Sequence, residues 1–197
     1  MHVDTARSDY GLVTQLFHWV TAILVVAAYF LGPGGREQRA FSPGMETTRD
    51  LHETLGFTVF VIVLLRILWR LFEGEVEHPG MASWISYSSK FFHLLLYALL
   101  LSIPATAIVG TWLQGHPLTL LVGEFGPFLT QAHDLGTSVM EIHTTLGDVI
   151  VWMAGLHAAV AIGHHFFLRD RVLVSMLPEW LIQPRSASRS KSGHIGT

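Results

Sequence analysis

Four long apolar segments limit what this chain can fold into more than any other feature. They lie at about 12–31, 51–72, 91–113 and 142–168. A bilayer core about 30 Å thick is crossed by about 20 mostly apolar helical residues. Only 14% of the 197 residues are charged, whereas soluble domains carry about 25%. The sequence therefore predicts an all-α integral membrane protein, a bundle of four transmembrane helices over 1–184. A basic, serine-rich tail at 185–197 is expected to be disordered.

The distribution of lysine and arginine predicts the orientation of this bundle. One side carries eight basic residues: Arg7, Arg70, Lys90, Arg169, Arg171, Arg185, Arg189 and Lys191. The other side carries three: Arg36, Arg39 and Arg49. We therefore expect both termini in the cytoplasm and the long connection at 114–141 outside. That connection is polar and glycine-rich, and we expect it to carry a short surface helix.

Histidines occur at two depths of the predicted bundle. His143 and His157 are 14 residues apart, a spacing that rises roughly 21 Å on a helix and returns to within about 40° of the same face. The orientation pairs His52 with His143 near the outer surface. It groups His18 and His157 near the inner surface, with His93 close by. Histidines facing a bundle interior need a strong reason to be there, and bis-histidine ligation of haem iron is one.

Two glycines follow the outer histidines at the same spacing. The pattern His-x-x-Leu-Gly occurs at 52–56 and again at 143–147. Gly56 and Gly147 would lie one turn beyond each ligand on the same face, where a flat macrocycle could approach the backbone. Ordinary packing of small residues is the alternative, but two matched copies favour the haem interpretation. The chain has no cysteine, so a haem would be bound without a covalent link.

Arg66 and several remaining histidines have less specific interpretations. Arg66 lies 14 residues beyond His52, so it shares that face at inner depth, where it could bind a haem propionate. The alternative is that it snorkels to the headgroups. His164 lies seven residues beyond His157, and it could contact a propionate or a quinone headgroup or simply lie at the interface. We expect His116 and His133, in the outer connection, to face solvent.

Taken together, the motifs resemble the bacterial di-haem cytochrome b561 family over roughly residues 7–178. The likeness rests on Gln15-Leu-Phe-His18-Trp19, on Leu51-His52-Glu-Thr-Leu-Gly56, on Val63-Leu-Leu-Arg66-Ile-Leu-Trp-Arg70-Leu, on His93-Leu-Leu-Leu-Tyr97 with Ile103-Pro104, on His143-Thr-Thr-Leu-Gly147, on the segment from Gly155-Leu-His157 through His164-His165 to Arg169-Asp170, and on Met176-Leu-Pro178. These motifs recur in order in all four spans, which makes the resemblance specific.

The resemblance implies a multi-pass protein of the bacterial inner membrane with two non-covalent b-type haems. It assigns His18 and His157 to one haem, and His52 and His143 to the other. The depth argument alone leaves His93 and His157 open as the second inner ligand. Members of the family move single electrons between quinone, such as ubiquinone, and another donor or acceptor. The implied partners are membrane lipid, quinone and either superoxide or a redox protein, with no nucleic acid.

One member of the family is a superoxide oxidase that passes electrons from superoxide to ubiquinone. That activity would benefit from positive charge at the outer mouth. Here the outer connection contains Glu124, Asp134 and Glu141 but no lysine or arginine. Only the three arginines of the outer side, at 36, 39 and 49, could attract the anion.

Two other functions are compatible with parts of the sequence. The chain could be the haem b membrane subunit of a larger dehydrogenase or hydrogenase. It could also be a histidine-lined metal transporter, but transporters usually have acidic ligands at mid-membrane. Asp148 is the one acidic residue well inside a span, which disfavours the transporter.

Overall fold

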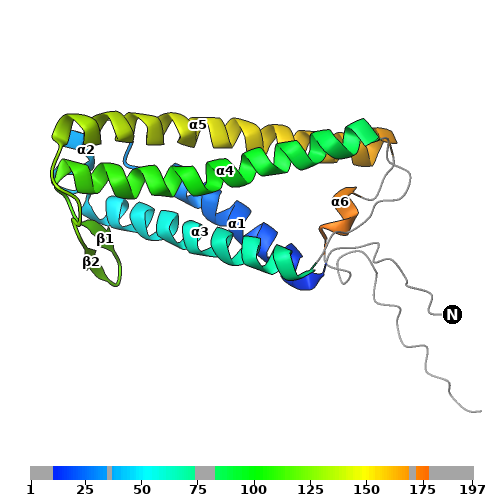
Figure 1. The fold of residues 1–197 in the computed structure, drawn as a ribbon, viewed down its shortest axis with the longest axis horizontal. Coiled ribbons are helices and arrows are strands. Elements are labelled where there is room, and N and C mark those ends of the chain that lie inside the picture. The colour runs from blue at the N-terminus through cyan, green and yellow to red at the C-terminus, as the bar shows by residue number, and fades with distance from the viewer. Residues whose placement is uncertain (1–10, 35–36, 74–82, 169–171, 178–197) are drawn as a thin grey trace, which may run out of the picture.

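Four long helices lying side by side dominate the computed structural model, which describes residues 11–34, 37–73, 83–168 and 172–177 (Figure 1). They are α1 (Leu12–Phe30), α3 (Glu46–Glu73), α4 (Ser83–Gln114) and α5 (His133–Gly163). The short elements are α2 (Glu37–Ala40), β1 (Leu118–Leu120), β2 (Gly123–Phe125), the π-helix η1 (His164–Leu168) and α6 (Val172–Ser175). Arg7, Arg36 and the tail at 185–197 lie outside the described residues.

The predicted four-helix membrane fold is confirmed. The helical stretches Leu12–Phe30, Glu46–Phe72, Ser86–Gln114 and His133–Phe167 are each long and apolar enough to cross a bilayer. Many of their large apolar side chains point outward; Phe72 is 86% exposed and Trp152 is 81% exposed. A soluble bundle would bury such groups, whereas a bilayer solvates them.

The connection between the third and fourth spans differs from the expectation of a surface helix. It forms an antiparallel hairpin of β1 and β2, in which Leu118 pairs with Phe125 and Leu120 with Gly123. The fold is therefore not purely helical. In addition, α5 begins at His133 rather than near 142, and α4 begins at Ser83 rather than near 91. Hydropathy marks only the apolar part of each helix, and the backbone hydrogen bonds continue through its polar first turns.

The long helices are not packed equally around the bundle. Within the described part of the chain, α4 packs closely along α5, α1 packs on α3, and α3 contacts α4, but α1 and α5 are not closely packed against one another. Gly110 and Gly136 let α4 and α5 approach; a Cβ on Gly136 would lie 2.8 Å from the backbone nitrogen of Gln114. The bundle is therefore more open between α1 and α5 than along its other sides.

Each end of the bundle is closed by side chains of the long helices. At the end that carries α2, β1 and β2, here called the hairpin end (Figure 1), Glu53 accepts a hydrogen bond from the backbone of Thr119, and Thr54 accepts one from Leu121. At the opposite end, the α6 end, the Gln15 amide donates to the Ser175 carbonyl over 3.0 Å. These contacts fix the short elements over the two ends of the interior.

Candidate functional site

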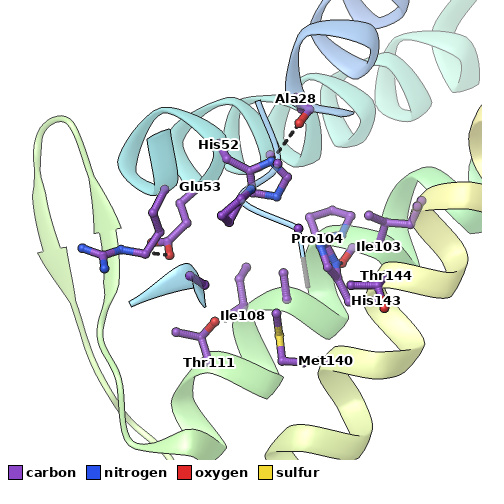
Figure 2. A pocket seen from close by; sticks show the side chains of 18 of the residues that line it. Ala28, His52, Glu53, Ile103, Pro104, Ile108, Thr111, Met140, His143 and Thr144 are labelled. Atoms are coloured by element: carbon purple, nitrogen blue, oxygen red, sulfur yellow. Dashed lines mark hydrogen bonds and ion pairs between the residues drawn. The ribbon is translucent and has the colours of Figure 1, made fainter. Parts of the chain in front are cut away.

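A large cavity opens inside the hairpin end of the bundle. Its volume is about 990 Å³, at the upper end of the roughly 300–1,000 Å³ usual for ligand pockets. Residues of α1, α3, α4 and α5 line it, including both predicted outer ligands and both matched glycines: His52, Gly56, His143 and Gly147. Figure 2 shows His52 and His143 entering this cavity from two different helices.

Backbone carbonyls of neighbouring helices anchor the two outer imidazoles. His52 Nδ1 donates to the Ala28 carbonyl of α1, and His143 Nδ1 donates to the Ile103 carbonyl of α4, each over 2.8 Å. The Ala28 carbonyl is available because α1 ends at Phe30 and the Gly32 N–H bonds Tyr29 instead. Because a carbonyl can only accept, both rings carry their proton on Nδ1. Each Nε2 therefore keeps the lone pair that a metal requires.

The separation of the two rings fits a metal between them. The His52 and His143 ring centroids are 6.1 Å apart, with an interplanar angle of 84°. A metal lies about 2 Å from a ligating imidazole nitrogen, and the ring centroid lies about 1 Å further back, so two opposed ligands place their centroids about 6 Å apart. A Cβ built on Gly56 or Gly147 would meet nothing within 4 Å. The open space beside Gly56 and Gly147, here called the cradle, suits a flat macrocycle.

The α6 end contains a second pair of imidazoles and a third histidine beside it. The centroids of His18 and His157 are 6.3 Å apart, close to the spacing of the first pair. His93 lies nearer to His157, at 5.2 Å, and its Nδ1 donates to the Ser89 carbonyl of its own helix over 2.7 Å. Phe92 stacks on His157 with an interplanar angle of 11°. The geometry therefore favours His18 as the group opposed to His157, with His93 beside the pair.

Arg66 and His164, the other predicted cofactor contacts, also lie toward the α6 end. The Arg66 guanidinium carbon is 5.4 Å from the centre of the Tyr97 ring. The guanidinium is also close enough to His18, His93 and His157 to interact with them electrostatically. Arg66 therefore lies near the three histidines of this end. His164 is the first residue of the π-helix η1, a kind of segment that often occurs at functional sites.

Charged groups at the hairpin end form a cluster that the sequence did not reveal. Arg49 pairs with Asp50 at 3.3 Å and lies 3.9 Å from Glu53, and its side chain is only 15% exposed. Glu37 of α2 holds His116 at 2.8 Å and His133 at 3.3 Å. The His133 side chain is 54% exposed, but that of His116 is only 33% exposed. His116 is therefore only partly open to solvent, because its ring also stacks on Phe41 at 3.8 Å.

Sequence reasoning missed two further interactions that involve polar groups of the spans. The Tyr29 hydroxyl of α1 donates to the Asp148 carboxylate of α5 over 3.2 Å. At the α6 end, the indole of Trp19 donates to the Met176 carbonyl over 2.8 Å. Single polar side chains in apolar helices are the only sequence signal for such contacts, and their partners lie 119 and 157 residues away.

Comparison with known proteins identifies the family. The family model described as prokaryotic cytochrome b561 matches residues 9–179, nearly the whole chain. The chain belongs to the prokaryotic cytochrome b561 family. It is 26% identical to cytochrome b561 homolog 1 of Escherichia coli over 84% of this chain and 95% of that protein. It is 27% identical to a probable superoxide oxidase, CybB, of Yersinia pestis over 88% of this chain and 98% of that protein.

Membership of the cytochrome b561 family gives the chain its general role. Proteins of this family are membrane electron carriers that bind b-type haem. Imidazole pairs anchored inside four apolar helices are suited to that role, because imidazole is a common axial ligand of haem iron. In the described part of the chain, no group of three or more histidine, aspartate or glutamate side chains is arranged so that it could hold a bare metal ion.

The open cradle beside the outer rings leads to a first prediction. Gly56→Val or Gly147→Val should weaken haem binding at the hairpin end, because the added methyl groups enter space that the macrocycle needs. An overpacking penalty of about 1–3 kcal/mol corresponds to roughly 5- to 150-fold in affinity. The measurement is haem titration of the purified apoprotein. Gly155→Val is the matched control, because Gly155 is exposed on α5 with nothing within 4 Å. Equal haem affinity in all three variants would contradict the cradle.

Proposed function

We propose that this cytochrome b561 binds two haem b groups and passes single electrons between a donor at the hairpin end and the quinone pool. His52 and His143 would ligate one haem, and His18 and His157 the other. The observation that carries this proposal is the pair of ring separations, 6.1 and 6.3 Å, which suit a bis-histidine iron. Bound haem supplies the one-electron redox chemistry.

The protein would orient the ligands, exclude water from the haem sites and set the distance between them. The carbonyls of Ala28 and Ile103 hold His52 and His143 by Nδ1, which makes each Nε2 a better ligand. His143 and His157 are 14 residues apart on α5, so the two sites lie roughly 21 Å apart along the helix. The apolar helices exclude water between them.

The orientation follows from the basic residues at the two ends. Among the described residues, Arg70 and Lys90 lie toward the α6 end, and Arg39 and Arg49 lie toward the hairpin end. In the whole sequence, eight of the twelve lysine and arginine residues lie before the first span, around the end of the second span and the start of the third, or after the fourth. By the positive-inside rule, we propose that both termini are in the cytoplasm of a bacterium and the hairpin faces outward from the inner membrane.

Superoxide is a candidate donor because of the name of the Yersinia relative, but the charges at the hairpin end disfavour an anion. Arg49 is already paired with two carboxylates. The described residues at this end include two basic groups, Arg39 and Arg49, and seven acidic ones: Glu37, Glu46, Asp50, Glu53, Glu124, Asp134 and Glu141. Such an excess repels small anions over a Debye length. We therefore propose a neutral or cationic donor.

The ligand assignment makes the central prediction. A pyridine haemochrome assay should give two haems per chain, and His52→Ala, His143→Ala, His18→Ala or His157→Ala should each remove one. His93→Ala should retain both, because the His93 ring is too close to His157 to oppose it across an iron. His116→Ala is a control outside both pairs. One haem in the unmodified protein, or the loss of haem in His93→Ala, would overturn the assignment.

The position of Arg66 leads to a third prediction. Arg66→Leu should lower the midpoint potential of the haem at the α6 end, because a fixed positive charge favours the more negative reduced state. At an effective dielectric constant near 20, a charge several ångströms away contributes on the order of 1–2 kcal/mol, or tens of millivolts for one electron. Spectroelectrochemical titration measures it, with Arg70→Leu, one turn further along α3, as control. An equal shift in both variants would show that Arg66 has no specific role.

The charges at the hairpin end lead to a fourth prediction. In stopped-flow reduction of the purified protein by superoxide, the rate should stay constant or rise as salt is added, because added salt screens the net negative charge. Arg39→Gln should not slow the reaction. Reduction by an uncharged quinol serves as the salt-insensitive control. A superoxide rate that falls severalfold with salt, and falls again in Arg39→Gln, would restore superoxide as a steered substrate.

A further inference from the structure

The hydrogen bond between Tyr29 and Asp148 lies on the open side of the bundle. It joins α1 to α5, the two long helices that are not closely packed against one another in the described structure. Both residues line the cavity that contains His52 and His143. Tyr29 is 43% exposed, and Asp148 is also exposed. The pair is therefore accessible both from the cavity and from the surface that faces lipid.

An acidic residue at this position is not explained by the haem sites. Asp148 is the only charged residue between 142 and 167 of the fourth span. A carboxylate inside a span is costly, and such residues usually mark a binding or transport site. The outer imidazoles donate instead to the carbonyls of Ala28 and Ile103. The Tyr29 hydroxyl and the Asp148 carboxylate, at an opening toward lipid, therefore suit a ligand that forms hydrogen bonds and dissolves in the bilayer.

We propose that Tyr29 and Asp148 form a lateral binding site for the headgroup of a quinone or quinol that enters from the bilayer between α1 and α5. This inference rests on the proposed function, in which the quinone pool exchanges electrons with the protein. A quinol hydroxyl would donate to the Asp148 carboxylate. A quinone carbonyl would accept from the Tyr29 hydroxyl. Val25 and Phe30, which also line the cavity, provide apolar surface for the ring and its tail.

The two roles differ, so each residue should affect one oxidation state more than the other. Asp148→Val removes the acceptor and should raise the quinol concentration that gives half-maximal haem reduction about tenfold, the effect of losing one charge-assisted hydrogen bond. Tyr29→Phe removes the donor and should weaken binding of the oxidised quinone by a similar factor. Tyr87→Phe and Glu124→Gln are matched controls, because Tyr87 is exposed near the α6 end and Glu124 is exposed on the hairpin.

The experiment uses purified, haem-loaded full-length protein with decylubiquinol and decylubiquinone as probes. Haem reduction by the quinol gives one readout, and quenching of tryptophan fluorescence by the oxidised quinone gives a second that does not depend on turnover. Haem content and reduction by dithionite are measured for every variant. Tenfold weaker quinol use in Asp148→Val and weaker quinone quenching in Tyr29→Phe, both with normal haem content, would support the site.

The outcomes separate this inference from the proposed function. If the unmodified protein bound no haem, or its haems were neither reduced by the quinol nor reoxidised by the quinone, the proposed function would fail and the inference with it. If the unmodified protein used quinol and both variants matched it within twofold, only the lateral site would be refuted. Loss of haem in both variants would instead show that the pair is a latch between α1 and α5, which also refutes the site.

Discussion

The arrangement of the hairpin end depends on hydrogen bonds that the protein itself must provide to two imidazoles, because no water reaches them in the bilayer interior. In the bilayer interior an unsatisfied ring nitrogen is costly, so each histidine needs a partner from the protein. His52 and His143 use carbonyls of helices other than their own, on α1 and α4. These bonds tie α3 to α1 and α5 to α4, and they fix the tautomer that leaves Nε2 available. The same two hydrogen bonds therefore orient both rings and connect the paired helices.

This anchoring also explains why one side of the bundle is open. The pairs α1 with α3 and α4 with α5 are each closely packed, and α3 and α4 join them. The remaining side, between α1 and α5, is bridged by the Tyr29–Asp148 hydrogen bond. Four helices around a macrocycle cannot all be at the usual 8–10 Å separation. The looser side is therefore where a lipid-soluble partner would approach most easily.

Much of this architecture could be predicted because it follows from local sequence patterns, namely the length of the apolar segments and the spacing of the histidines. Apolar length predicted the four helices, and the 14-residue spacing predicted that His143 and His157 lie at two depths of one helix. The hairpin could not be predicted, because its strands have only three residues each and are held by Glu53 and Thr54 of a distant helix. The Tyr29–Asp148 contact could not be predicted from the sequence either. Neither residue belongs to a motif, and the packing of α1 relative to α5 determines their proximity.

The proposed haem sites and the proposed donor surface are subject to different physical constraints. In the proposed function, the histidine pairs, the carbonyls that anchor His52 and His143, and the two glycines must match the fixed geometry of an iron macrocycle. The hairpin end must match only its partner. The chain is only 27% identical to the probable superoxide oxidase of Yersinia pestis, so its rim charges need not match those of that protein. The paired Arg49 and the surrounding carboxylates therefore say more about the donor to this chain than the name of its relative does.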